Sequence, residues 1–208
     1  MPTRTDTRTP ALALAILVVA GCAATETGRE LPDISAWERR TAVLAALDEF
    51  EFAGRIGVQA AGDGFNGRFR WEQDESRFDA SISGPLGIGT VLIQGDGRHV
   101  VVTDNDGETV EMHDVESELY YRYGWTIPVS SLRFWALGIP DPDMPATTEF
   151  GAAGELVRLD QAGWSVEISR YREVAGGQQM PGRLTAKNPR TSVRLVIDRW
   201  TFHERPDA

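Results

Sequence analysis

Hydrophobic positions early in the chain recur at helical spacing around residues 35–48. Trp37 and Leu44 lie on one stripe of such a helix. Ser35 and Glu38 have the spacing of a capping box, in which each side chain pairs with a free backbone N–H at the helix start. The pattern therefore predicts one amphipathic helix that packs its apolar stripe on a larger apolar surface.

After Phe52 the hydrophobic period changes to two, which is the period of a strand. Ile56, Val58 and Ala60 alternate with polar or small residues, and similar runs follow almost to the end of the chain. Turn signals such as Gly62-Asp63-Gly64 separate these runs. About ten short strands in one domain predict an antiparallel sheet that curls into a barrel or sandwich.

One segment in the middle of the strand pattern is helical instead. Glu116–Gly124 and Ser131–Gly138 predict two short helices, and on the second of them Leu132, Trp135 and Ala136 share a face. Both helices are strongly aromatic and would expose a large apolar surface if nothing covered it. We therefore expect them to lie over the concave face of the sheet.

Composition narrows the class of protein. The chain has 208 residues, of which 41% are hydrophobic and 25% charged, so it is an ordinary globular sequence and not a disordered one. Its net charge of -10 argues against a nucleic-acid partner, because phosphate binding needs clustered Lys and Arg. One cysteine and three histidines leave little for a metal site and nothing for an internal disulfide.

Residues that could carry catalysis are isolated in the sequence. There is no Gly-x-Ser-x-Gly elbow, phosphate loop or His-Glu-x-x-His pair. His99, His113 and His203 stand alone on predicted strands and are expected to be ordinary surface or edge residues. Asp141 and Asp143 flank a proline, and a solvated loop explains them better than paired acid–base carboxylates. The sequence predicts no enzyme and no metal site.

The amino terminus looks like a secretory signal. Arg4 and Arg8 precede an unbroken apolar run, Ala11–Ala20, which is too short to span a bilayer. The run ends at Val19-Ala20-Gly21-Cys22, which resembles a bacterial lipobox. That resemblance implies a signal peptide over residues 1–21, a lipidated Cys22 and a tether over residues 22–34, followed by a single domain over residues 35–208.

Short sequence motifs occur at particular places along this order of signal, tether, helix, strands and central helices. The longest is Ile127-Pro128-Val129 leading into a helical stretch that ends at Gly138-Ile139-Pro140. Further words are Trp37, Gly54-Arg55-Ile56, Phe69-x-Trp71, Pro85-Leu86-Gly87, Gln161-x-Gly163-Trp164-x-Val166, Tyr171, Met180-Pro181 and Asp198-Arg199-Trp200. From residue 12 to about 202 the chain resembles the LolB family of outer-membrane lipoprotein receptors.

The resemblance implies a fold and a function. The fold is mainly β with helices (α+β): an unclosed antiparallel β-barrel of ten or eleven strands over an apolar cavity, with an N-terminal helix and a helical lid inserted mid-chain. The function is to accept acylated lipoproteins from a LolA-like periplasmic carrier and insert them into the outer membrane. The protein is expected to be a monomer anchored to the inner leaflet by N-acyl diacylglycerol on Cys22, with no other cofactor.

The cavity should be lined by apolar side chains without hydrogen-bond partners, because lipid tails supply none. Each candidate is as compatible with ordinary core packing as with contact to an acyl chain, and which face of each strand points inward is open. The candidates are Phe69, Trp71, Ile82, Leu92, Trp125, Trp135, Leu137, Trp164 and Trp200.

A Gly- and Pro-rich turn is the candidate membrane contact. It comprises Pro85, Leu86, Gly87 and Ile88, and turns lie at the surface. From the residues alone, Leu86 is expected to fold back on the core, whereas the resemblance implies that it protrudes and touches the membrane during cargo insertion.

Two questions stay open at this point: the function of the chain and the reason for its acidic charge. The chain could be a structural outer-membrane lipoprotein whose sheet has a filled core and binds another envelope protein. The acidic net charge is explained by solubility, or by steering toward a basic rim on the carrier.

Overall fold

The computed structural model describes residues 34–60, 62–84, 89–96, 99–123, 126–174 and 178–203, all within the unit Pro32–Ala208. Three of the sequence predictions fall outside these residues: lipidation of Cys22, the membrane contact at Pro85–Ile88, and Trp125 in the cavity lining. The predicted signal peptide and nearly all of the tether also lie outside them.

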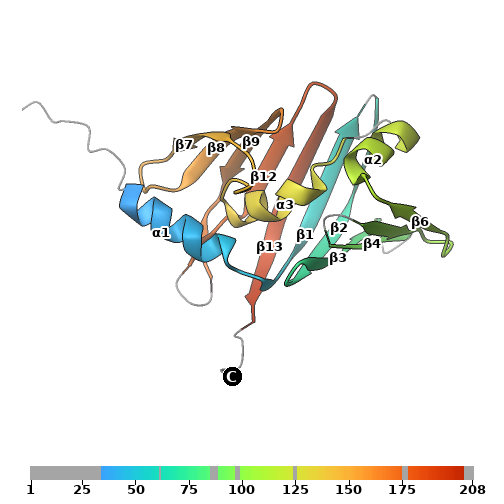
Figure 1. Cartoon of the computed structure of the whole chain (residues 1–208), viewed down its shortest axis with the longest axis horizontal. Helices are drawn as coiled ribbons and strands as arrows, with labels where there is room; N and C mark the ends of the chain where they lie inside the picture. Colours follow the sequence, from blue (N-terminus) through green and yellow to red (C-terminus); the bar gives the residue numbers. More distant parts are fainter. Residues whose placement is uncertain are drawn as a thin grey trace, which may run out of the picture. The chain divides into compact units, whose positions relative to one another are not determined.

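Eleven antiparallel strands form one sheet in the order β6-β5-β4-β3-β2-β1-β13-β12-β9-β8-β7. The edge strands β6 and β7 each pair on one side only, so the sheet is not closed (Figure 1). A separate pair is formed by β10 and β11. The strands are β1 Glu49–Ala60, β2 Asp63–Asp74, β3 Arg77–Ser83, β4 Thr90–Gly95, β5 Val100–Thr103, β6 Thr109–Met112, β7 Ala146–Phe150, β8 Leu156–Gln161, β9 Trp164–Ser169, β10 Arg172–Glu173, β11 Gln179–Met180, β12 Arg183–Lys187 and β13 Thr191–Phe202.

In the part of the chain that the structure describes, three helices accompany the sheet: α1 Ile34–Ala45, α2 Val115–Tyr123 and α3 Val129–Leu137. In Figure 1, α1 and α3 lie across one face of the sheet, which we call the inner face; the opposite face is the outer face. Gly138 ends α3 with a left-handed φ of 79°, a conformation that glycine adopts without a steric penalty. None of the helices in the described part of the chain is both long and hydrophobic enough to cross a bilayer.

The centre of the sheet is a long pair, β1 with β13, interrupted by a β-bulge at Ala53/Gly54. Only glycine fits at position 54, because a Cβ there would lie 1.9 Å from the carbonyl oxygen of Val196. The bulge shifts the register so that apolar residues on both sides of it face inward. The aromatic residues of the pair (Phe50, Phe52, Trp200 and Phe202) therefore lie on the same face as the aliphatic residues beyond the bulge.

The sequence predicted this fold class correctly: a mainly β chain with an unclosed antiparallel sheet, an early helix and two helices inserted in the middle. The central helices begin one or two residues before their predicted starts. The early helix ends at Ala45, a turn earlier than predicted. β7 was not predicted, because its sequence, ATTEF, has no clear alternation of apolar and polar residues.

Candidate functional site

Aromatic rings cover the inner face at the centre of the sheet. The ring of Phe52 lies 4.9 Å from that of Trp200 and 5.6 Å from that of Phe69, measured between centroids. Trp71 and Phe78 stack at 4.4 Å. These five rings come from β1, β2, β3 and β13, and the register brings them together because Phe52 is paired with Trp71 on one side and Trp200 on the other.

The polar atoms of these tryptophans are satisfied within the protein. The indole N–H of Trp71 donates to Gln73 Oε1 at 3.0 Å, and that of Trp200 donates to the Pro181 carbonyl at 3.0 Å. Gln73 in turn donates to the carbonyls of Glu75 and Arg77. The rings therefore make purely apolar contacts, and all five are buried, with at most 8% of their surface exposed.

Beneath α3 the inner face is filled. Trp135, Leu137 and Ile139 have 0% exposed surface, so no water-sized space touches their side chains. Trp164 packs 6.3 Å from Trp135 and is also buried. The expectation of a cavity beneath this helix is therefore not met by the described residues, because the large side chains of α3 occupy the space.

A buried polar network fixes α3 to the edge of the sheet. Gln161 on β8 accepts hydrogen bonds from Trp135 Nε1 at 2.8 Å and from the Asp141 N–H at 2.9 Å. Its amide donates to the carbonyls of Asp141 and Met144 at 2.9 Å. Asp141, 4% exposed, accepts from Ser131 Oγ on α3 at 2.8 Å. The prediction that Asp141 belongs to a solvated loop is wrong, since its carboxylate completes this network.

The inner face is less covered over the other half of the sheet, which is formed by β2 to β6. Apolar residues on β2 to β6 there are half-buried, and most of the outward-pointing residues between them are polar, with Leu92 and Val101 as exceptions. We call this surface the open apolar face; it consists of Phe65, Ile82, Val91, Ile93, Val102 and Val110. It continues from the aromatic rings, because Ile82 is paired with Phe69 across β2 and β3.

Leu92 does not belong to this face, which corrects one of the predicted cavity residues. Leu92 is paired with Ser81 and Thr103, whereas its neighbour Ile93 is paired with Ala80 and Val102. Successive side chains of a strand point to opposite sides, so Leu92 lies on the outer face, where it is 43% exposed. All three residues of the run Val91-Leu92-Ile93 are apolar, so hydrophobicity alone does not distinguish the one that points outward.

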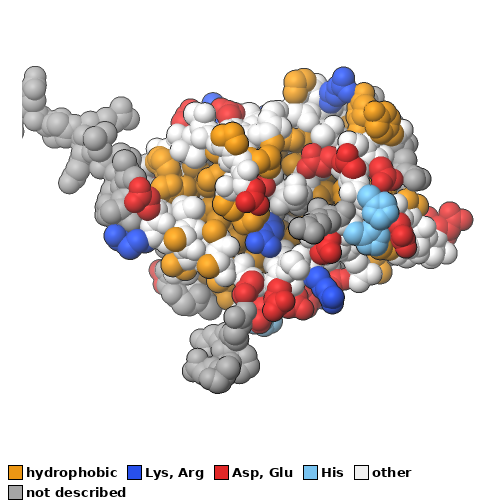
Figure 2. All heavy atoms as spheres, viewed as in Figure 1, with side chains coloured by type: hydrophobic (Ala, Val, Ile, Leu, Met, Phe, Trp, Pro, Cys, Tyr) orange, Lys and Arg blue, Asp and Glu red, His pale blue; other side chains and the backbone are white. Residues whose placement is uncertain are grey.

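α2 lies at the border of the open apolar face. Arg190, at the tip of the β12–β13 hairpin, stacks over the Tyr120 ring at 4.9 Å. Ser130 donates to Glu116 Oε1 at 3.4 Å, and partial burial raises the pKa of the Glu116 carboxyl. In the view of Figure 2, hydrophobic side chains gather over α1 and α3, and acidic side chains lie around α2. Where the side chains of α2 are described they are half-buried or exposed, whereas five residues of α3 are buried.

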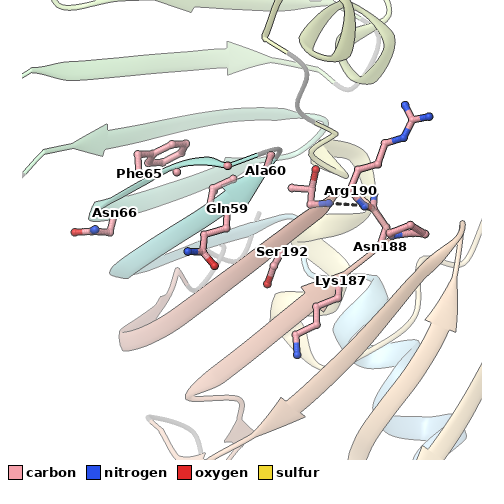
Figure 3. A pocket seen from close by; sticks show the side chains of 13 residues that line it. Gln59, Ala60, Phe65, Asn66, Lys187, Asn188, Arg190 and Ser192 are labelled. Atoms are coloured by element: carbon pink, nitrogen blue, oxygen red, sulfur yellow. Dashed lines mark hydrogen bonds between the residues drawn. The ribbon is translucent and has the colours of Figure 1, made fainter.

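Three pockets are lined by described residues, and of the five aromatic rings only Phe78 lines one of them. The largest, of about 600 Å³, opens between the β1–β2 and β12–β13 hairpin tips and is lined largely by polar side chains such as Gln59, Asn66 and Lys187 (Figure 3). The other two lie around β3 and β4, one at their Phe78 and Gly95 ends and one on the outer face beside Leu92. None of these three is the predicted apolar cavity.

Two histidines that the sequence left isolated are neighbours. β5 and β6 bring the rings of His99 and His113 within 5.1 Å, and His99 Nε2 lies 3.5 Å from Glu111. Even so, no group of three potential metal ligands was found among the described residues. The pairing could not be read from the sequence, because it depends on the register of two short strands.

Comparison with known proteins identifies the family. The family described as "Outer membrane lipoprotein LolB" matches residues 48–200, which include the whole sheet apart from the last two residues of β13. The chain belongs to the LolB family. Its role therefore lies in outer-membrane lipoprotein localisation, and the family is not a known family of enzymes.

Several similar proteins carry the same family name. The chain is 30% identical to the outer-membrane lipoprotein LolB of Nitrosococcus oceani over 90% of its own length and 94% of that protein's. It is 31% identical to LolB of Pseudomonas paraeruginosa, covering 90% and 93% of the two chains. It is 32% identical to LolB of Stutzerimonas stutzeri, covering 88% and 90%. These relatives are outer-membrane lipoproteins, and they match nearly from end to end.

Solved structures support the fold. A DUF1329 family protein from Desulfovibrio piger aligns with a TM-score of 0.52 at 8% identity, over 82% of this chain and 93% of its own. A putative outer membrane lipoprotein-sorting protein domain from Vibrio parahaemolyticus aligns with a TM-score of 0.51 at 7% identity, over 84% and 93%. At such low identity the likeness concerns the LolB fold alone.

Within this LolB-family fold, the predicted cavity residues other than Leu92 and Trp125 fall into two groups. Phe69, Trp71 and Trp200 belong to the aromatic rings, and Ile82 extends them toward the open apolar face. Trp135, Leu137 and Trp164 lie in the filled core beneath α3. Sequence reasoning did not select most of the open apolar face, because single valines in short strands carry no signal that distinguishes them from core.

Proposed function

We propose that the chain receives acylated lipoproteins from a LolA-like periplasmic carrier and passes them into the outer membrane, with the acyl chains held on the open apolar face. The observation that supports this is the difference in cover across one continuous apolar surface. Under α3 the surface is sealed, whereas at Ile82, Ile93 and Val102 it is half-buried. Shielding is needed, since a sixteen-carbon chain costs on the order of 10 kcal/mol when exposed to water.

In this proposal the membrane attachments come from residues outside the described part of the chain. Cys22 carries the acyl anchor in the inner leaflet of the outer membrane, and residues 22–34 are the tether. Leu86 in the Pro85–Ile88 turn touches the bilayer, where burial of one leucine gains about 1.5–3 kcal/mol. That energy is enough to hold the transfer site against the membrane but too little to anchor the protein.

The proposal is tested by binding of a hydrophobic fluorophore, bis-ANS, and its displacement by an acylated lipoprotein. Ile93→Asp places a carboxylate on the open apolar face and should weaken fluorophore binding by about tenfold or more, because a charge cannot enter an apolar contact without a large desolvation cost. Leu92→Asp is the matched control: it adds the same charge one residue away on the outer face and should leave binding unchanged.

Urea unfolding of both variants separates a binding defect from loss of structure. Equal binding by the Ile93 variant and the parent, or no displacement by lipoprotein, would contradict the proposal and favour a structural lipoprotein that binds another envelope protein. Val102→Trp offers a second, uncharged route: filling the face with a ring should also reduce binding.

Leu86→Glu tests the delivery step separately. The variant should accept lipoprotein as the parent does, since its acceptor face is unchanged, but should transfer it to liposomes more slowly. The measurement is the rate of lipoprotein appearance in sedimented liposomes, and equal rates for variant and parent would rule out a membrane role for this turn.

A further inference from the structure

A row of basic residues crosses four adjacent strands on the outer face. Arg55 on β1 is directly opposite Arg68 on β2. Arg194 on β13 lies one diagonal step from Arg55, because Arg55 is paired with Val196, two residues away. Lys187 on β12 lies one diagonal step further, since it is paired with Ser192. Diagonal neighbours in a sheet are about 7–8 Å apart, so these four residues form a continuous patch, which we call the basic row.

The charges of the basic row are largely unneutralised. Among the described residues, no ion pair joins Arg68, Arg194 or Lys187 to an acidic side chain. Arg55 lies 3.3 Å from Asp198, but both side chains are more than half exposed, so Asp198 offsets little of the Arg55 charge. Placing Arg55 opposite Arg68 is unfavourable for the sheet, because like charges on directly paired residues repel.

The other half of the same outer face is built differently. There Arg70 contacts Glu51 at 2.9 Å and Glu72 at 3.0 Å, and Arg199 lies 3.5 Å from Glu51. Mixed and paired charges are what a merely soluble surface needs. A basic row in which only Arg55 has an acidic partner, on a chain of net charge -10, therefore points to an anionic partner.

Most outward positions next to the basic row are uncharged; the acidic exceptions are Asp198 beside Arg55 and Glu167, one diagonal step from Lys187. Gln59, Asn66 and Ser192 occupy neighbouring outward positions, and Gly57, between Arg194 and Asn66, has no side chain and nothing within 4 Å of where a Cβ would stand. In Figure 3, Lys187 and Arg190 extend away from each other at the edge of the pocket between the hairpin tips. Such an arrangement suits a broad array of anions better than a single bound ion.

We propose that the basic row docks on the phosphate headgroups of an anionic phospholipid bilayer. The inference rests on the proposed function in one respect: the lipid anchor keeps the domain beside a membrane. A tether of residues 22–34 reaches at most about 40 Å when extended, so the bilayer is the anionic surface that the domain meets most often. Each basic residue near such a surface contributes about fivefold in affinity, corresponding to about 1 kcal/mol. The row thereby sets which end of the sheet faces the lipid.

Lys187 supplies the measurement, because it is the one lysine in the chain. The full lipidated protein is reconstituted into vesicles of phosphatidylcholine alone or of phosphatidylcholine mixed with phosphatidylglycerol. Lys187 is then acylated with a water-soluble, amine-reactive reagent. The rate is measured by mass spectrometry of the peptide that contains Lys187. We expect the reaction to slow by about tenfold with phosphatidylglycerol present, and to recover in 1 M salt, where the Debye length falls to about 3 Å.

Gly57→Glu and Gly57→Gln form a matched pair of variants. The open space at Gly57 admits either side chain, and only the first adds a negative charge within the basic row. Gly57→Glu should lose about fivefold of the protection of Lys187, and Gly57→Gln should keep it. Equal reaction rates in the two kinds of vesicle, equal protection in both variants, or protection that requires an added acidic protein instead of lipid, would each overturn the proposal. Fluorophore binding by the same samples, measured without vesicles, reports on the open apolar face and so separates failure of this inference from failure of the proposed function.

Discussion

Gln161 is the residue whose loss should loosen α3 most directly. Gln161→Leu keeps the size of the side chain but removes an amide that makes four hydrogen bonds. Three of the groups left behind are deeply buried: the indole N–H of Trp135 and the N–H and carbonyl of Asp141. The Met144 carbonyl is only partly buried and can bind water instead. The variant thus creates unpaired polar groups without creating a cavity.

The magnitude follows from these three groups. Each buried donor or acceptor left without a partner costs about 1–3 kcal/mol. Burial of the more hydrophobic leucine side chain offsets about 1.5–3 kcal/mol of the sum. The balance is about 3 kcal/mol, which corresponds to a fall in Tm of about 6–12 °C for a domain of this size.

Urea unfolding followed by tryptophan fluorescence measures this change, since Trp135 itself reports on the site. Gln59→Leu is the control: Gln59 is exposed on the outer face, so removing its amide should change the free energy of unfolding by less than about 0.5 kcal/mol. A loss below about 1 kcal/mol for the Gln161 variant would refute the view that this amide holds α3 in place.

Two further outcomes follow from the sheet. Gly54→Ala should unfold the protein or cost more than about 3 kcal/mol, because its Cβ would overlap the Val196 carbonyl, whereas Gly57→Ala should be neutral within about 0.5 kcal/mol; thermal unfolding of both variants checks the contrast. Glu51→Gln should cost up to about 1 kcal/mol at pH 7, because hydrogen bonding from Arg70 lowers the pKa of the Glu51 carboxyl and the pair stabilises the fold. That contribution is present above the ordinary carboxyl pKa of 4.5 and is lost as the pH falls through the lowered value, so stability curves of variant and parent that stay parallel down to pH 2 would contradict it.

Much of the fold was predictable because it depends on local patterns. The period of two in β1 and the i, i+3, i+4 face of α3 each report a local geometry, and both were identified from the sequence. The sequence motifs shared with the LolB family then indicated how these elements are arranged. What failed was local too: Leu92 sits in a run of three apolar residues, and no pattern distinguishes its two faces.

The site was less predictable, because it depends on contacts between distant residues. Gln161 and Trp135 meet only through the packing of α3 on β8, and Asp141 becomes a buried acceptor only as part of that contact. The partial exposure of Ile93 and Val102 likewise depends on what packs over them in the folded chain. Sequence identifies these residues as apolar or polar but does not say which of them remain accessible.

The unequal strand lengths have a mechanical consequence. β1 and β13 run for 12 residues each, whereas β5 and β6 have four, and a short outer strand can part from its neighbour at the cost of only a few backbone hydrogen bonds. The part of the sheet that carries β5 and β6 is thus easier to deform than the β1–β13 pair. Separation of these short strands would widen the apolar surface without disturbing the long central pair. Substitutions in β5 and β6 can therefore adapt the apolar surface to larger or smaller ligands while the rest of the sheet stays unchanged.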